Sequence, residues 1–240
     1  MKEFSRVGFM QGRLTPMENG VLQCFPRNNW RNEFNLANTS GFTLMEWTLD
    51  EEGLSENPLM TREGRREISY LKNKYNISIE SVTADCFMQR PLWEYSNNTA
   101  ITSVNRLIQV IESCSSMNTK FLIIPLVDNS SISDASSEKI FLQALKEVES
   151  RLIDSKLMIL FESDLPPLKL KALIGQLPEN IYGINYDTGN SASLGYDPRI
   201  EINSYGERIK NIHLKDRLIE GKSVPLGEGN ANFELLFDIF

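Results

Sequence analysis

Two carboxylates and the only histidine of the chain stand at regular intervals in the sequence. Glu162 ends an apolar run that starts at 157, Asp187 ends a strand-like run from 182, and His213 ends a run from 209. The intervals are 25 and 26 residues, close to the length of one strand-loop-helix-loop unit. If the three side chains meet, they form a site for a divalent metal such as Mn²⁺, Zn²⁺, Co²⁺ or Mg²⁺. The alternative is that they are polar residues at the rim of the fold.

The sequence around these residues predicts alternating strands and helices that would position them. Strands are expected near residue 7 and over 42–48, 76–85, 121–128, 157–162, 182–187 and 209–213. Helices are expected over 28–38, 60–75, 102–117, 136–153 and 166–177 and from 233 onward, while 197–209 is helical or irregular and the loop 87–98 suits a lid or pocket wall. Such alternation implies parallel strands with right-handed crossovers.

Two folds fit this alternation, an open doubly wound sheet and a (β/α) barrel. The first normally carries a glycine-rich phosphate turn after its first strand, and residues 10–14, Met-Gln-Gly-Arg-Leu, do not form one. A barrel places its functional residues at the carboxyl ends of several strands. Acids or histidine end six of the expected strands, namely Glu46, Asp85, Asp128, Glu162, Asp187 and His213. We therefore expect one α/β TIM-barrel domain over 1–240, with seven strand-helix units and the eighth missing.

Composition excludes several classes of protein. The 240 residues are 41% hydrophobic and 24% charged, as in a single soluble domain. A net charge of −7 disfavours a nucleic-acid partner, whose phosphates require a basic surface. Neither a leader sequence nor an apolar run of the roughly 18 residues needed to cross a membrane is present, so we expect a cytoplasmic protein with no membrane partner. The three cysteines, Cys24, Cys86 and Cys114, are expected to be reduced packing residues.

Several short motifs carry a resemblance to a known family. They are Gly8-Phe-Met-Gln-Gly-Arg-Leu, Asn185-Tyr-Asp-Thr-Gly-Asn, Gly195-Tyr-Asp-Pro, Ile212-His-Leu-Lys-Asp-Arg217 and Pro225-Leu-Gly-Glu-Gly-Asn-Ala-Asn-Phe233. Together they resemble the sugar phosphate isomerase/epimerase family of the xylose isomerase-like barrels. The resemblance implies a divalent metal held by Glu, Asp, His and a further acid from strands five to eight. Glu162, Asp187 and His213 match the first three of these ligands.

The resemblance also implies a reaction, which is isomerisation or epimerisation of a small sugar or sugar phosphate through an enediolate. The metal would act as a Lewis acid, and Glu162 would serve both as a ligand and as the general base. Lys215 and Arg217 would contact a substrate hydroxyl or phosphate, unless they are solvated loop charges. Gln11, Arg13 and Glu46 would line the pocket, with salt bridges at the rim as the alternative.

The sequence departs from the family pattern at strand eight, which should supply the fourth ligand and a second acid/base. An open barrel leaves strand edges unpaired, so we expect a homodimer that covers the opening or an incomplete active site. A sugar-binding protein without turnover is therefore an alternative function. Apurinic/apyrimidinic endonucleases share similar motifs, but they require a cluster of zinc ions and many histidines, and this chain has one histidine.

Overall fold

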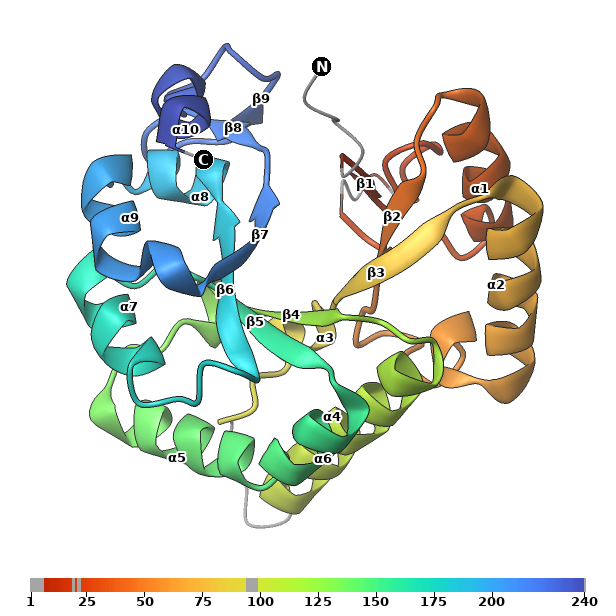
Figure 1. Cartoon of the computed structure of the whole chain (residues 1–240), viewed down its shortest axis with the longest axis horizontal. Coiled ribbons are helices and arrows are strands. Elements are labelled where there is room, and N and C mark those ends of the chain that lie inside the picture. The colour runs from red at the N-terminus through yellow and green to blue at the C-terminus, as the bar shows by residue number, and fades with distance from the viewer. Residues whose placement is uncertain (1–6, 19, 21–22, 94–98, 240) are drawn as a thin grey trace.

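The computed structural model describes residues 7–18, 20, 23–93 and 99–239, and within them seven parallel strands follow one another in chain order. The sheet curls so that β1 and β7 face each other across an opening, with the helices on the outside (Figure 1). The strands are β1 (Phe9–Met10), β2 (Leu44–Thr48), β3 (Ser78–Thr83), β4 (Phe121–Leu126), β5 (Met158–Ser163), β6 (Tyr182–Asp187) and β7 (Ile209–His213). The barrel fold is confirmed, with an incomplete eighth unit.

The helices lie where apolar residues recur at helical spacing and where capping residues begin or end them. The Asp134 side chain accepts hydrogen bonds from the backbone at the start of α5, and Asn76 ends α2 in the left-handed conformation at φ 55°. The α-helices are α1 (Trp30–Thr39), α2 (Arg62–Tyr75), α3 (Cys86–Gln89), α4 (Thr99–Ser116), α5 (Ala135–Lys146), α6 (Glu149–Ser155), α7 (Pro167–Ile174), α8 (Thr188–Ser193), α9 (Pro198–Tyr205) and α10 (Phe233–Ile239). Among the described residues, short 3₁₀ turns cover Pro58–Met60, Asp128–Ser130 and Gly206–Arg208.

The core lies between the outer face of the sheet and these helices. On β2, the fully buried Trp47 packs edge-on against Trp30 of α1, with ring centroids 5.6 Å apart. On β5, Phe161 packs against Phe141 of α5 at 5.3 Å and stacks on Tyr182 of β6 at 5.9 Å. Because neighbouring side chains of a strand point to opposite faces, this outward packing of Trp47 and Phe161 turns the adjacent acids, Glu46 and Glu162, inward.

Some boundaries differ from the sequence-based expectations. The helix expected over 136–153 is two helices, α5 and α6, which meet at residues 147–148. The segment after β7, which carried no expected strand, contains the antiparallel hairpin β8 (Asp216–Arg217) and β9 (Ser223–Val224). The expected loop 87–98 opens with the last residues of α3, and its residues 94–98 lie outside the described part of the chain. Within the described ranges, no helix is long and apolar enough to cross a membrane.

Candidate active site

Glu162, Asp187 and His213 meet inside the curled sheet, as their spacing predicts. Each offers one ligand atom, and these three atoms lie within 4.8 Å of one another. Asp187 and His213 are direct partners in the register between β6 and β7, while Glu162 comes from the neighbouring strand β5. Parallel pairing in this register places all three side chains at the same end of the sheet.

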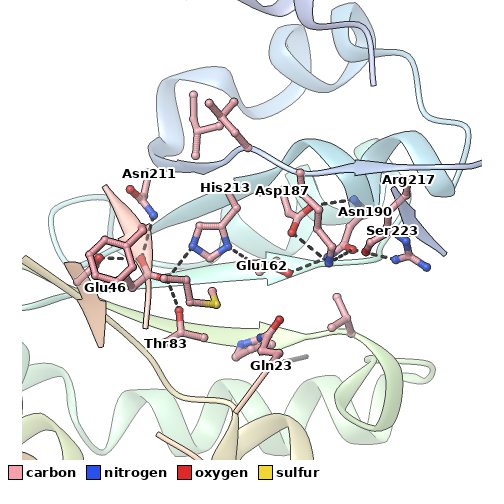
Figure 2. A pocket seen from close by; sticks show the side chains of 18 of the residues that line it. Gln23, Glu46, Thr83, Glu162, Asp187, Asn190, Asn211, His213, Arg217 and Ser223 are labelled. Atoms are coloured by element: carbon pink, nitrogen blue, oxygen red, sulfur yellow. Dashed lines mark hydrogen bonds and ion pairs between the residues drawn. The ribbon is translucent and has the colours of Figure 1, made fainter. Parts of the chain in front are cut away.

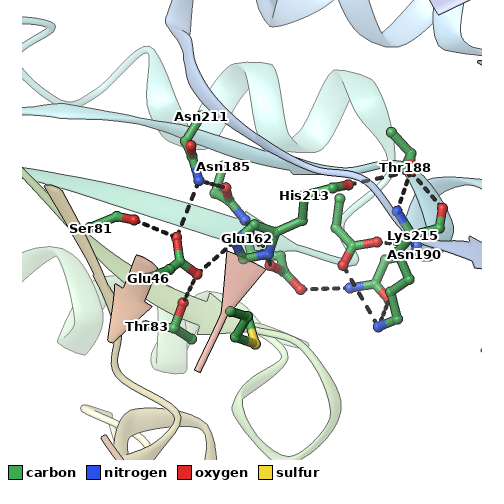
Figure 3. Close-up of polar contacts among 12 residues, drawn as sticks. Glu46, Ser81, Thr83, Glu162, Asn185, Thr188, Asn190, Asn211, His213 and Lys215 are labelled. Carbon is green, nitrogen blue, oxygen red and sulfur yellow. Dashed lines mark hydrogen bonds and ion pairs between the residues drawn. The ribbon is translucent and has the colours of Figure 1, made fainter. Parts of the chain in front are cut away.

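His213 is held between two carboxylates. Its Nε2 lies 2.8 Å from Oε1 of Glu46, and its Nδ1 lies 3.1 Å from Oε2 of Glu162 (Figure 3). Glu46 in turn accepts hydrogen bonds from two hydroxyl groups of β3, Ser81 at 2.7 Å and Thr83. Glu46 therefore fixes the orientation of the imidazole ring and turns Nδ1 toward Glu162.

Two asparagines hold the carboxylate of Glu162. Asn185 donates to Oε2 at 2.8 Å, and Asn190 donates to Oε1 at 2.7 Å. Asn211 of β7 continues this network by donating to the side-chain oxygen of Asn185 at 2.8 Å. These amides fix Glu162 without adding charge, and they form a polar interior where many barrels have apolar layers.

The Asp187–Asn190 motif forms the junction between β6 and α8. Asp187 Oδ1 accepts a hydrogen bond from the Asn190 backbone at 2.7 Å and thereby caps the helix. The Thr188 hydroxyl donates to the Lys215 carbonyl at 2.6 Å and accepts from the Lys215 backbone nitrogen at 2.9 Å. Gly189 permits this close approach, because a Cβ there would lie 2.8 Å from the Lys215 side chain. The motif thus joins the ends of β6 and β7.

Burial and neighbouring charges change the acidity of the site. Burial opposes the charged form of His213, but the carboxylates of Glu46 and Glu162 outweigh it and raise the pKa of His213 well above its usual value. Burial also opposes ionisation of Glu46, yet the contact with His213 and the two hydroxyl donors lower its pKa. The pKa of Asp187 is raised by burial and by the charge of Glu162. The site is thus a cluster of negative charge balanced by one imidazolium.

This donor set suits a divalent cation. Two carboxylates and an imidazole nitrogen are ligands for Zn²⁺, Mn²⁺ and related ions. The hydrogen bond from Nε2 to Glu46 leaves Nδ1 of His213 facing Glu162, which is the carboxylate–histidine arrangement that supports metal-binding imidazoles. A bound cation would also relieve the repulsion between Asp187 and Glu162.

The β8–β9 hairpin covers one side of the site and carries Arg217. Asp216 anchors the segment, since its carboxylate accepts hydrogen bonds from the backbone of Arg217 and of residues 227, 229 and 231. Gly229 is needed for this contact, because a Cβ there would lie 2.2 Å from Asp216 Oδ1. Glu228, which lies between Gly227 and Gly229, is exposed. Arg217 reaches Asn190 Oδ1 at 2.9 Å (Figure 2).

The three candidate ligands open onto a cavity of about 1260 Å³. The structure brings most of the sequence-predicted substrate residues to its wall, namely Glu46, Arg13, Lys215 and Arg217. Arg13 donates to Gln23 at 3.2 Å, and Lys215 lies 3.3 Å from Asn190 Oδ1 and 3.7 Å from Asp187 Oδ2. Gln11 is placed elsewhere: it is 1% exposed, and its side-chain oxygen accepts from the Thr48 backbone.

Sequence reasoning missed the amides and hydroxyls of the site. Asn185 and Asn211 stand on inward-facing strand positions, and Asn190 stands three residues after the end of β6; these positions are the signal that could have identified them. Ser81 and Thr83 alternate along β3 in the same way. Their partners lie on other strands, so the sequence alone did not show which groups they contact.

The curled parallel sheet, with acids and a histidine at the carboxyl ends of successive strands, defines a (β/α)-barrel protein with a candidate metal site. The chain belongs to the xylose isomerase-like TIM barrel family, whose sequence model matches residues 34–240. No protein of curated function matches the sequence.

Solved structures share the fold at low sequence identity. One is a xylose isomerase domain protein from Planctomyces limnophilus, with TM-score 0.71, 13% identity, 96% of this chain covered and 82% of that chain. Another is D-psicose 3-epimerase with D-tagatose from Clostridium cellulolyticum H10, with TM-score 0.71, 12% identity and coverages of 97% and 81%. A third is the IOLI protein with a bound zinc atom, with TM-score 0.71, 13% identity and coverages of 97% and 84%. At this identity the likeness establishes the fold.

Proposed function

We propose that the protein is a metal-dependent sugar isomerase or epimerase that acts beside the carbonyl of a small ketose or aldose. The observation that carries this proposal is the meeting of Glu162, Asp187 and His213, with ligand atoms within 4.8 Å, on the wall of a cavity with room for a small sugar. Sugar epimerases among the proteins of similar fold support it. A bound divalent ion would supply Lewis-acid charge next to the substrate oxygens.

The side chains divide the work as follows. Glu162 accepts the proton from the carbon next to the carbonyl, while Asn185 and Asn190 hold its carboxylate in a fixed orientation. Asp187 and His213 would hold the ion together with Glu162, and Glu46 orients the imidazole. The polar groups of the surrounding wall bind the substrate hydroxyls, so the reacting carbon is placed against Glu162.

A second candidate function is sugar binding without turnover. Epimerisation needs acid/base groups on both faces of the enediolate. Within the described residues, the candidate ligand group has three members, and none of them comes from an eighth strand of the barrel sheet. Isomerisation requires only one base and the ion, and Glu162 can serve as that base.

Metal analysis and proton exchange test the proposal together. The purified chain is expected to bind one Mn²⁺ or Zn²⁺, and His213→Ala is expected to abolish this binding. With metal added, ketoses incubated in D₂O should gain deuterium at the carbon next to the carbonyl, and Glu162→Gln should slow this exchange by about 10²–10⁴-fold. Glu112→Gln, on the exposed face of α4, is the matched control.

The outcomes separate the two candidates. Metal and sugar binding without deuterium exchange would leave a binding protein. A chain that binds no divalent ion would overturn both the metal site and the isomerase.

A further inference from the structure

The wall of the cavity carries an excess of negative charge. Among the described residues that line it, eight are carboxylates and four are lysines or arginines. The carboxylates come from successive strand ends and loops: Glu46, Glu80, Asp85, Asp128, Glu162, Asp164, Asp187 and Asp216. The cations are Arg13, Lys210, Lys215 and Arg217. Lys120, which does not line the cavity, pairs with Glu80 at 2.8 Å, and a divalent ion at the candidate metal site would offset two further charges, so a smaller excess of carboxylates would remain.

The two cations closest to the metal ligands are already bound to protein oxygens. Arg217 donates through Nε and Nη2 to the Gly221 carbonyl at 3.1 and 2.9 Å, and through Nη1 to Asn190. Lys215 lies between Asn190 and Asp187. A phosphate group binds well where an arginine fork or several free donors converge on it. Here both side chains already give most of their N–H donors to protein oxygens, which leaves fewer of them for a phosphate.

The cation on the other side of the cavity belongs to a relay that ends in a carboxylate. Arg13 donates to Gln23 at 3.2 Å, and Gln23 donates to Asp85 Oδ2 at 2.8 Å. Asp85 is 1% exposed, and within the described part of the chain its Oδ1 has no hydrogen-bond partner. A phosphate placed near Arg13 would therefore also face the acidic end of this relay.

The remaining polar groups of the wall suit hydroxyl groups. Amide and hydroxyl side chains from several segments of the chain line the cavity, among them Ser193 and, as Figure 2 shows, Gln23, Thr83, Asn190, Asn211 and Ser223. Amides and hydroxyls offer both donors and acceptors, as sugar hydroxyls do, and they are indifferent to net charge. We infer that this site takes an uncharged, unphosphorylated sugar. The inference rests on the proposed function and names the substrate class of the same site.

Binding of matched sugar pairs tests the inference. The metal-loaded full chain is titrated calorimetrically with D-allulose, D-tagatose and D-fructose, and with the 6-phosphate ester of each, at constant ionic strength. At least one free sugar should bind about tenfold or more tightly than its ester, because like charges across the cavity repel the phosphate. An ester that binds as tightly as its parent sugar, or more tightly, would overturn the inference and leave the proposed function intact. If no member of the panel binds or exchanges deuterium, the proposed function fails and the inference fails with it.

Variants that remove a negative charge away from the candidate metal ligands test whether repulsion causes the preference for the free sugar over its phosphate ester. Asp128 lines the cavity at φ 53°, a left-handed conformation that asparagine adopts readily, so Asp128→Asn should leave the fold unchanged. Asp164→Asn removes the neighbouring charge, and Asp154→Asn on the outer helix α6 is the control. Each cavity variant should lower the preference for the free sugar about two- to fivefold, and the control should not change it. An unchanged preference in both cavity variants would overturn the electrostatic argument.

Discussion

The side chains of Glu46 and His213 are hydrogen-bonded at 2.8 Å although 167 positions separate them in the chain. Glu46 lies on β2 and His213 on β7, so this bond joins the two arms of the sheet that face each other across the opening. It connects the second strand directly to the candidate metal site. Both the binding of a cation and the shape of the cavity therefore depend on Glu46.

Replacing Glu46 by glutamine should weaken metal binding about 10- to 100-fold, the usual loss when a carboxylate that supports a metal-binding histidine is changed. Glutamine offers one acceptor oxygen where Ser81, Thr83 and His213 now use two. Competition with a fluorescent chelator measures the affinity, and Glu112→Gln on α4 is the control. Equal affinities in the two variants would show that Glu46 does not support the site.

The buried carboxyl of Asp85 should make stability depend on pH. Burial, reinforced by neighbouring carboxylates, raises the pKa of Asp85 to about 7 from an ordinary value of 3.8. Between these values the folded protein binds a proton that the unfolded chain does not, so stability from this group is present at low pH and lost as the pH rises through about 7.

Urea denaturation at several pH values compares the original chain with Asp85→Asn. The difference in unfolding free energy should decline by at most about 1.4 kcal/mol per pH unit up to neutrality and then stay constant. Asp154→Asn should show no such slope, because Asp154 is exposed on α6. A flat difference for Asp85→Asn would mean that its carboxyl titrates normally.

Removal of the Asp216 carboxylate should loosen the segment that follows β7. Asp216→Ala leaves four backbone N–H groups without their acceptor, those of Arg217, Gly227, Gly229 and Ala231. Amide hydrogen exchange should become about fivefold faster at these positions, since one lost hydrogen bond corresponds to roughly 1 kcal/mol. Asp134→Ala, which removes the cap of α5, should speed exchange only at the start of that helix. Unchanged protection of the segment would contradict the anchoring role.

The aromatic cluster behind β5 should dominate the stability of this half of the sheet. Phe161 is fully buried between Phe141 and Tyr182, so Phe161→Ala should lower the unfolding free energy by about 3–5 kcal/mol. Leu168→Ala on α7 is the control, because Leu168 is 70% exposed and its loss should change stability by about 0.5 kcal/mol or less. A Phe161→Ala loss below 1 kcal/mol would mean that this core repacks freely.

The sequence allowed the strand ends to be predicted better than the contacts between them. Glu162, Asp187 and His213 were identifiable because parallel strands in register bring their carboxyl ends to one edge. The bond between Glu46 and His213 was not, since it depends on how far the sheet curls. Asn190 belongs to a sequence motif, yet its bonds to Glu162 and Arg217 depend on how α8 packs against β5 and the β8–β9 hairpin.

The break between α5 and α6 and the β8–β9 hairpin were not predicted because the local sequence carries no signal for them. Residues 136–153 keep an apolar periodicity across the break between α5 and α6, and neither glycine nor proline marks it. The strands of the β8–β9 hairpin are two residues each, too short to show alternation. Its position depends on Asp216, whose partners lie up to 15 residues further along the chain.

The imidazole between Glu46 and Glu162 is the only one in 240 residues. Its ring protons therefore give an NMR signal that needs no assignment and that originates inside the candidate site. One resonance can report protonation, cation occupancy and the arrival of a sugar in turn, in the unmodified protein.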